Sequence, residues 1–326
     1  MALRRAPAAA LVCFVGLTAC GGGGEDGAGP SATTDAEPAL RLPYDVEVDE
    51  DGRVYIADGG LHQVLRFDPG TGELSVVAGT GQPGSDGDGG PAKAAKVNEP
   101  VGLALASDGT LFLSDFPAGR VRRIDPAGMI TTVARLPQPA EVALDGAERY
   151  LAVPSLADVL HRVDLATGKI DTLARPQEPH GAAYDEAGDL YFPDGNYIRK
   201  LDRRAGRVAT IAGNGQREAT GDGGPARDAG VDAVKLVVAP DGSLYVVGGD
   251  LYGGTVRRIS DGTIEAVVGS GTLGPNGEGG QALDAGIQPS DVAVAPDGSL
   301  IVSQIEPEAA IRRIDPDTGV ITTIVS

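Results

Sequence analysis

The chain has 326 residues, with 46 acidic and 27 basic side chains and a formal net charge of −19. Such an acidic surface repels the phosphates of nucleic acids and anionic lipid headgroups, so nucleic acid is not an expected partner. Tryptophan is absent and aromatic residues make up only 4% of the chain, which argues against an aromatic platform for stacking bases or sugars.

The first 20 residues have the pattern of a secretory signal. A basic pair, Arg4 and Arg5, precedes a mostly apolar stretch over 6–19 that is too short to span a bilayer. The sequence Leu17-Thr-Ala-Cys20 resembles the lipobox of bacterial lipoproteins, which implies a signal peptide over 1–19 and lipidation of Cys20. An ordinary signal peptide with an incidental cysteine is the alternative.

Residues 20–39 are rich in Gly, Ser, Thr, Pro and acidic residues. Such a segment cannot bury enough apolar surface to offset the entropy of ordering it, so we predict a flexible linker. The only other cysteine, Cys13, lies in the predicted signal peptide, and the mature chain would therefore contain no disulfide. The expected location is extracytoplasmic, with the chain attached to the bacterial cell membrane by its lipid alone, in the periplasm or at the cell surface.

A four-part pattern recurs six times after the linker. The first copy has apolar runs in Asp45–Gly52, Val54–Asp58, Val64–Pro69 and Leu74–Ala78, and the sixth copy has them in Asp291–Gly298, Leu300–Ser303, Ile311–Pro316 and Val320–Val325. The runs are rich in Val, Ile, Leu and Tyr and are separated by Gly, Asp and Pro, which is typical of strands and tight hairpins. The copies lie near residues 43–99, 100–138, 139–178, 179–232, 233–288 and 289–326.

Three of the copies end in a longer connection that shares one motif. It is Gly-rich, with a Gly-Asp/Glu-Gly-Gly-Pro/Gln-Ala core, and it occurs over Ala78–Val97, Ala212–Val231 and Val268–Ile287. Glycine supplies turns with positive φ, and Pro-Ala starts a short helical turn, so we expect a structural loop that covers the top face. Asp86 and Asp88 suggest calcium binding as the alternative.

Six four-stranded units predict an all-β, six-bladed β-propeller of antiparallel blades over 40–326. Because the sixth copy contains all four runs itself, we expect the ring to close by side-chain packing. The pattern resembles the NHL repeat family, of the six-bladed TolB-like type, on the strength of Pro289–Val294, Tyr55–Asp58, Val121–Asp125 and Val76–Gly79. The resemblance implies ion pairs between the acids that end the second strands (Asp58, Asp115, Asp194) and third-strand basic residues (Arg66, Arg123, Lys200).

The first strands of a propeller line its axis, and their entry points share the top face with the connections between the second and third strands. Counting back from the hairpin glycines places Asp45, Glu141, Lys235 and Asp291 at equivalent entry positions, with His180 beside Gly181. We predict that these five residues form a polar ring that binds a ligand. Asp45, Glu141, His180 and Asp291 would suit a divalent cation such as Ca²⁺ or Zn²⁺, or could supply an acid or base. A hydrated channel mouth, partly neutralised by Lys235, is the alternative.

Two classes of function follow from these residues. The first is a non-catalytic binding or scaffold module for a small ligand or a protein on the top face. The second is a metal-dependent propeller enzyme of the lyase or lactonase type that uses the channel ring. The amidating lyases that resemble this fold need three histidine ligands, and only His180 stands at an entry position here. Glu141, Asp194 and Asn196 are a loose match to the lactonase metal site. RNA binding would require a basic top face.

Overall fold

The structure, a computed structural model, describes residues 40–250 and 253–326. All of the described residues belong to one compact unit, Pro38–Ser326. The predicted signal peptide, the predicted lipidation site Cys20 and the predicted linker over 20–39 lie outside the described residues.

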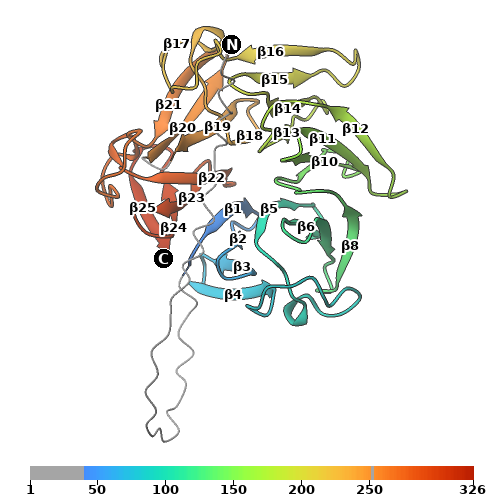
Figure 1. The fold of residues 1–326 in the computed structure, drawn as a ribbon. Helices are drawn as coiled ribbons and strands as arrows, with labels where there is room; N and C mark the ends of the chain where they lie inside the picture. Colours follow the sequence, from blue (N-terminus) through green and yellow to red (C-terminus); the bar gives the residue numbers. More distant parts are fainter. Residues whose placement is uncertain (1–39, 251–252) are drawn as a thin grey trace, which may run out of the picture. The chain divides into compact units, whose positions relative to one another are not determined.

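The described residues form six antiparallel sheets, each built from strands consecutive in the chain, which is the predicted six-bladed propeller (Figure 1). Blade 1 consists of β1 (Pro43–Val48), β2 (Val54–Asp58), β3 (Gln63–Asp68) and β4 (Glu73–Ala78). Blade 2 consists of β5 (Pro100–Leu105), β6 (Leu111–Asp115), β7 (Arg120–Ile124) and β8 (Ile130–Arg135). Blade 3 consists of β9 (Ala143–Leu144), β10 (Tyr150–Ser155), β11 (Val159–Asp164) and β12 (Ile170–Ala174).

The second half of the ring has the same order of strands. Blade 4 consists of β13 (Ala183–Tyr184), β14 (Leu190–Pro193), β15 (Ile198–Leu201) and β16 (Val208–Ala212). Blade 5 consists of β18 (Lys235–Val238), β19 (Leu244–Asp250), β20 (Gly253–Ser260) and β21 (Thr263–Val268). Blade 6 consists of β22 (Gln288–Val294), β23 (Leu300–Glu306), β24 (Ala310–Ile314) and β25 (Ile321–Val325).

Glycine fixes the hairpins between the first and second strands. Gly52, Gly109, Gly242 and Gly298 all have φ near +80°, a conformation that side chains with a Cβ rarely adopt. The Asp-Gly pairs of the sequence therefore lie where the repeat pattern predicted them. Because each blade is a simple meander, the connections entering the first strand and those joining the second to the third lie on one side, which we call the top face.

The hydrophobic core is divided among the interfaces between neighbouring blades. Blades 1 and 2, for example, share a cluster that includes Val64, Leu103 and Ile130. The ring closes in the same way, because Val46 and Ile56 of blade 1 pack with Ile301 and Ile311 of blade 6. Blade 6 takes all of its strands from its own repeat, so the predicted closure by side-chain packing is confirmed for the described residues.

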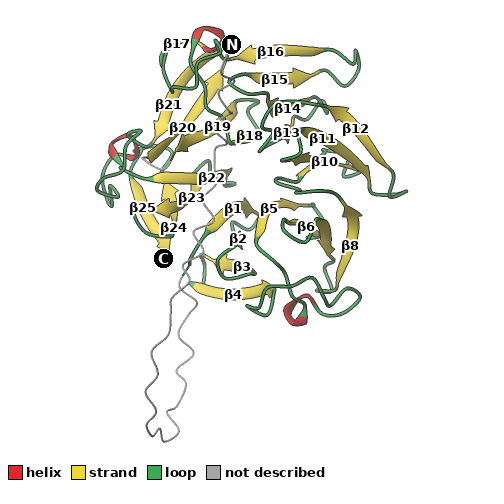
Figure 2. Cartoon of the chain, viewed as in Figure 1, coloured by secondary structure: helices red, strands yellow, loops and turns green. Residues whose placement is uncertain are grey.

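The three long connections each contain a 3₁₀ turn, drawn in red in Figure 2: η1 (Ala92–Ala94), η2 (Ala226–Asp228) and η3 (Ala282–Asp284). The predicted helical turn is therefore present, but it does not simply cover the top face. The first alanine of each turn is buried in the hydrophobic cluster between two neighbouring blades. The segment before each turn pairs with the outer strand of the next blade, through β17 (Gly224–Pro225) with β21 and through the bridges Pro91–Met129 and Gln281–Val320.

Candidate functional site

The first strands bring charged side chains together at the axis of the ring. The Lys235 Nζ contacts Oδ2 of Asp45 and Oε2 of Glu141, and it also donates to the carbonyl of Val101 at 3.3 Å. Asp291 accepts a hydrogen bond from the Val46 N–H at 3.0 Å. All four charged side chains are buried. The structure therefore brings Lys235, Asp45 and Glu141 into one ion-pair cluster that joins blades 5, 1 and 3 across the channel.

Burial and crowding perturb the protonation of this cluster. Burial raises the pKa of Glu141 well above its ordinary value, although Lys235 opposes the shift. Burial, with the charge of Asp45 as the next cause, raises the pKa of Asp291 to about 7. Burial alone would lower the pKa of Lys235, but the surrounding carboxylates raise it above its ordinary value. One ammonium thus lies among several buried carboxyl groups, an arrangement that favours the protonated forms of Glu141 and Asp291 over their ordinary balance.

The charges of Asp45, Asp291 and Lys235 also act on Glu47, which was not among the predicted site residues. It follows Asp45 by two positions in β1, so both side chains lie on the same face of the strand. Burial, and then the charges of Asp45 and Asp291, raise the pKa of Glu47 well above its ordinary value. The sequence did mark this position, because most other blades have alanine there and blade 1 has a carboxylate.

Within the described residues, no hydrogen bond or ion pair joins His180 to the channel carboxylates. Its imidazole pKa is lowered mainly by burial, and the charged groups that act on it are Glu178, Arg217, Asp232 and Lys235. Within 40–250 and 253–326, no three or more His, Cys, Asp or Glu side chains are grouped so that they could hold a metal ion. The predicted set Asp45, Glu141, His180 and Asp291 is therefore divided, with two of its members held by Lys235.

A second polar region lies on the top face of blade 4. It is an open hollow of about 370 Å³, lined by Gln177, Glu178, Asp194, Gly195, Asn196, Tyr197, Arg199 and Arg217. The first two residues come from the connection before blade 4, the next five from the end of β14 to β15, and Arg217 from the connection that leaves β16. Sequence reasoning had named only Asp194 and Asn196 of this group, and in another context.

Asp194 organises the floor of the hollow. One carboxylate oxygen accepts the Gln177 N–H at 3.0 Å and the other accepts Nε of Arg199 at 3.0 Å. The Arg199 guanidinium stacks over the Tyr197 ring with its Cζ 4.7 Å from the ring centre. Arg217 pairs through Nε with Asp232 at 3.1 Å. The hollow therefore presents two fixed guanidinium groups to solvent.

The ion pairs implied by the family resemblance are shifted by one residue. Asp194 pairs with Arg199 and not with Lys200, and Asp115 lies 3.7 Å from Arg122 and not beside Arg123. The reason is strand alternation, since adjacent residues of β7 and β15 point to opposite faces. Lys200 instead pairs with Asp185 and Asp189.

Blade 1 departs from the implied pairing altogether. Its second-strand acid, Asp58, accepts backbone N–H groups of Arg41, Leu42 and Leu61, and Arg66 forms no ion pair within the described residues. The acid at the end of β2 thus orders the chain that enters blade 1, and no arginine is needed beside it.

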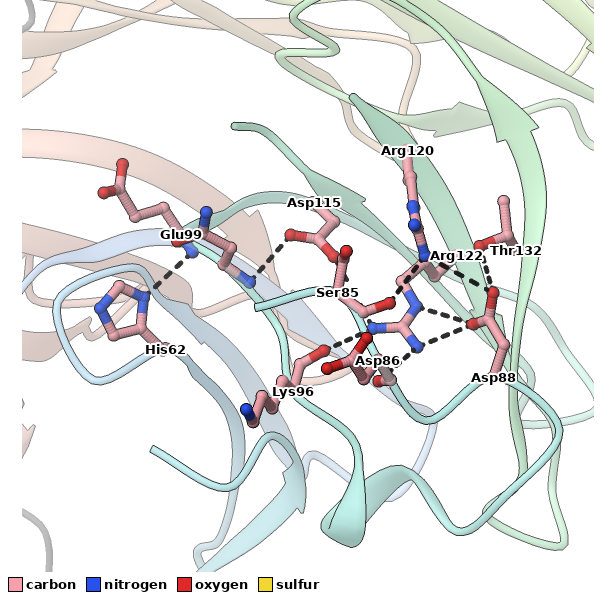
Figure 3. A network of polar contacts seen from close by, with 11 residues as sticks. His62, Ser85, Asp86, Asp88, Lys96, Glu99, Asp115, Arg120, Arg122 and Thr132 are labelled. Atoms are coloured by element: carbon pink, nitrogen blue, oxygen red, sulfur yellow. Dashed lines mark hydrogen bonds and ion pairs between the residues drawn. The ribbon is translucent and has the colours of Figure 1, made fainter. Parts of the chain in front are cut away.

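The long connections bind buried arginines of the blade that follows. In blade 2, Arg122 is fully buried and donates to the carbonyl oxygens of Lys96 and Asp86 and to the carboxylate of Asp88, which also accepts the Thr132 hydroxyl (Figure 3). Arg257 and Arg312 are held in the same way by Asp222 and Glu278. The Asp88 carboxylate is thus used by Arg122, and the calcium interpretation of Asp86 and Asp88 gains no support from this geometry.

The two remaining histidines lie away from both polar regions. His62 accepts the Glu99 N–H through Nδ1 at 3.2 Å, which ties blade 1 to the entry of blade 2 (Figure 3). His161 lies in β11, and neither ring nitrogen has a hydrogen-bond partner in the described part of the chain. No helix in the described ranges is long and apolar enough to cross a membrane.

Comparison with solved structures supports the same architecture. A protein of unknown function and an auxiliary nutrient binding protein, both from Bacteroides thetaiotaomicron, match with TM-scores of 0.65 at 17% and 14% identity, and cover 85% and 87% of this chain and 70% of their own. A virginiamycin B lyase from Staphylococcus aureus matches with a TM-score of 0.56 at 16% identity, over 86% of this chain and 83% of its own.

Among curated proteins, human teneurin-1 is 28% identical over 221 residues, which are 53% of this chain and 8% of teneurin-1. SUPPRESSOR OF QUENCHING 1 from Arabidopsis thaliana is 36% identical over 103 residues, which are 32% of this chain and 9% of that protein. The chain thus spans less than a tenth of these relatives, and no family model matches it. At these identities the likeness establishes the fold alone, a six-bladed β-propeller.

Proposed function

We propose that this chain is a lipid-anchored, extracytoplasmic NHL-type propeller that binds a small ligand or a protein on its top face. The binding site in this proposal is the hollow over blade 4. The channel ring acts as a structural ion-pair cluster that links three blades at the axis.

One contrast carries the proposal. In the channel, Lys235 contacts Asp45 and Glu141, and the three side chains are buried. In the hollow, polar side chains line an open volume of about 370 Å³, and Arg199 keeps 26% of its side chain exposed. Ligand sites are concave and contain a few polar groups fixed by neighbours, as Asp194 and Tyr197 fix Arg199.

The location is supported by the sequence before the propeller. The basic start, the short apolar stretch and Leu17-Thr-Ala-Cys20 favour export and lipidation. Two structural neighbours are auxiliary nutrient binding proteins, from Bacteroides thetaiotaomicron and Bacteroides ovatus, a role that fits a surface-held binding module. Replacing Cys20 by alanine should move the chain from the membrane fraction to the soluble fraction, whereas Cys13→Ala should leave it in the membrane.

The binding proposal can be tested without knowing the ligand, by filling the hollow with a larger side chain. Gln177 is exposed and bonds in the hollow only through its backbone, whose N–H donates to Asp194 and whose carbonyl accepts the Gly195 N–H. Gln177→Trp should therefore fill the space and leave the fold intact. We expect any ligand that raises the melting temperature of the wild-type chain to lose that effect in Gln177→Trp. Lys93→Trp, at an exposed position of the first long connection, is the matched control and should keep it. Ligands that stabilise both variants equally would place the site elsewhere.

A metal-dependent enzyme that uses the channel is the second candidate. The observation in its favour is that burial raises the pKa of Glu141 and raises the pKa of Asp291 to about 7, and a carboxyl group that titrates near neutral pH, as Asp291 does, can act as a general acid or base. Against it, Lys235 already holds two of the carboxylates that would bind the metal. Thermal melts with EDTA decide between the two. A metal centre predicts a lower melting temperature after chelation, whereas the ion-pair cluster predicts an unchanged melting temperature.

A further inference from the structure

We propose that blade 4 binds an extended peptide segment of a partner protein, with an acidic side chain of that segment on Arg199 and its backbone paired to the edge of β16. The inference rests on the proposed function, because it names the ligand class of the same hollow. It comes from a comparison of the six blades, three of which already hold such a segment of their own chain.

The six blades differ at one equivalent position of the third strand. Blades 2, 4, 5 and 6 have an arginine there, whereas blade 1 has leucine and blade 3 has histidine (Leu65, Arg122, His161, Arg199, Arg257 and Arg312 in chain order). Arg122, Arg257 and Arg312 have side-chain exposures of 0%, 4% and 0%, whereas Arg199 has 26%. The three buried arginines each follow a long connection, and Arg199 follows a short one.

The long connections supply a carboxylate to these arginines. Nη2 of Arg122 donates to Asp88 at 2.7 Å, Nε of Arg257 to Asp222 at 2.9 Å, and Nη2 of Arg312 to Glu278 at 3.0 Å. Backbone carbonyls add to the contact, since Arg122 also binds Lys96 O and Arg257 also binds Gly230 O, both at 2.7 Å. Charge-assisted bonds of this kind are the strong ones in proteins.

A threonine on the outer strand completes the site in blades 2 and 6. Thr132 lies opposite Arg122 and donates its hydroxyl to Asp88 at 2.6 Å. Thr323 lies opposite Arg312 and donates its hydroxyl to Glu278 at 2.7 Å and its N–H at 3.0 Å. An arginine and a threonine in register therefore form a two-point carboxylate site, and the chain fills it twice.

Blade 4 has the same pair without the acid. Thr210 lies opposite Arg199 in the same register, and its hydroxyl contacts Nη1 of Arg199. Nε of Arg199 is taken by Asp194, as Arg122 is flanked by Asp115 in blade 2. In the described part of the chain no carboxylate occupies the place that Asp88 and Glu278 take, and the hollow opens beside Arg199.

The backbone of the outer strand is also open in blade 4. In blade 2, Ile130 donates its N–H to Gly90 O at 3.0 Å and accepts the Gly89 N–H at 2.7 Å, so the long connection extends the sheet. The equivalent residue of blade 4 is Val208, and β16 is the edge of its sheet. An unpaired edge of this kind is a template for an added strand.

An apolar position supports the same conclusion. The first residues of the outer strands in blades 2, 5 and 6 (Ile130, Ile264 and Ile321) have 0% exposure beneath the long connections, whereas Val208 has 53%. A small carboxylic acid would satisfy Arg199 but would leave Val208 and the strand edge uncovered. An extended peptide covers all three, and an acidic side chain of that peptide would take the place beside Arg199 that Asp88 takes beside Arg122.

Blade 3 shows that an open edge alone is not the site. Its outer strand β12 is also an edge, and Ile170 at its start is 39% exposed. The third-strand position there is His161, whose ring nitrogens are buried and bind no described group, so no guanidinium awaits a carboxylate. Blade 4 combines the edge, the apolar residue and the arginine–threonine pair.

The test uses a peptide that the chain already binds within itself. A fluorescent peptide with the sequence of residues 84–97 carries the acid, the glycines and the Pro-Ala of the first long connection. We expect the full chain to raise its anisotropy saturably. Arg199→Gln in the chain and Asp88→Asn in the peptide should each weaken binding by about tenfold or more, and the two changes together should add little beyond either.

Two further variants separate charge from strand pairing. Val208→Pro removes the outward N–H at the first residue of an edge strand, where proline is tolerated, and should also weaken binding. Arg123→Gln removes an exposed third-strand charge of blade 2 and should leave binding unchanged. Unfolding midpoints of all variants show whether each is folded.

The outcomes separate this inference from the proposed function. Peptide binding that ignores Arg199→Gln or Asp88→Asn would overturn it, as would glutarate binding as tightly as the peptide, which would indicate a small-anion site. A ligand lost in Gln177→Trp, together with an acidic peptide that does not bind, would leave the proposed function standing and refute the peptide.

Discussion

The channel and the hollow over blade 4 are both polar, but the chain treats their charges differently. At the axis, the Lys235 ammonium lies against Asp45 and Glu141, and each of the three side chains keeps less than a tenth of its surface in contact with solvent. Over blade 4, Arg199 has one carboxylate partner, Asp194, and keeps a quarter of its side chain in contact with solvent. The first region is closed by residues of the chain itself, and the second has room for a group from outside.

Blades 2 and 4 show what makes the difference. Both place an arginine and a threonine in register on the third and fourth strands. Only blade 2 is preceded by a long connection, which brings Asp88 onto Arg122 and covers the sheet edge. A repeat protein can thus convert an internal structural contact into an exposed site by shortening one connection, without any change in the strands.

Lys235→Met should have the largest effect on the unfolding free energy, because it removes the buried cation of the channel cluster. It leaves Asp45 and Glu141 buried with no cation, and breaking a buried ion pair on one side costs about 3–5 kcal/mol of unfolding free energy. Urea unfolding at pH 7 measures this loss. The matched change in the open region, Arg199→Met, should cost less than about 1 kcal/mol, since partly exposed pairs contribute little. Equal losses in the two variants would contradict the division into a closed and an open region.

Asp291→Asn should give the next largest effect, with the opposite sign at neutral pH. The folded pKa of Asp291 is about 7 and its ordinary value is 3.8, so ionising the folded carboxyl is unfavourable. This cost is absent below pH 4, grows between pH 4 and 7, and is complete above pH 7. Asparagine removes the charge and keeps the acceptor for the Val46 N–H. We expect a gain of about 2 kcal/mol at pH 7.5 and none at pH 4.

The measurement is the pH dependence of the unfolding free energy for the wild-type chain and Asp291→Asn. The wild-type chain should lose stability relative to the variant as the pH rises from 4 to 7. Asp297 is a suitable control, because its pKa is lowered to about 2 by hydrogen bonds from Ser299 and Arg313, so Asp297→Asn should lose stability at neutral pH. If the stability curves of the wild-type chain and Asp291→Asn ran parallel between pH 4 and 7, the pKa of Asp291 would not be raised in the folded chain.

Much of the channel could be predicted from the sequence, because its register is set by the hairpin glycines. Counting back from Gly52 and its equivalents placed Asp45 and Lys235 at the axis, and the structure joins them. Counting to one entry position per blade did not identify every charged residue at the axis. It selected one residue per blade and so passed over Glu47, which lies two residues further along β1 on the same face.

The hollow could not be predicted in the same way, since it forms where blade 4 has only a short connection before it and no described segment covers Arg199. The short connection before blade 4 looked like the ordinary case and the long connections looked like additions. The informative signal was the combination of a short connection with Arg199, an arginine of the kind that long connections bury elsewhere. The meaning of this combination depends on the contact between Asp88 and Arg122. These residues are 34 positions apart in the sequence, and that spacing does not reveal the contact.

Asp88→Ala should give the smallest of the three effects, and it makes blade 2 resemble blade 4. Arg122 would keep the carbonyls of Lys96 and Asp86, and Asp115 3.7 Å away, but would lose its hydrogen-bonded carboxylate while fully buried. We expect a loss of about 1 kcal/mol in urea unfolding, below the full cost of a buried pair because Asp88 itself is one-third exposed. Asp86→Ala is the matched control, since the structure uses only the backbone carbonyl of Asp86, and its cost should stay within about 0.5 kcal/mol. A calcium site predicts a different result, in which both alanine variants lose stability alike and added calcium stabilises only the wild-type chain.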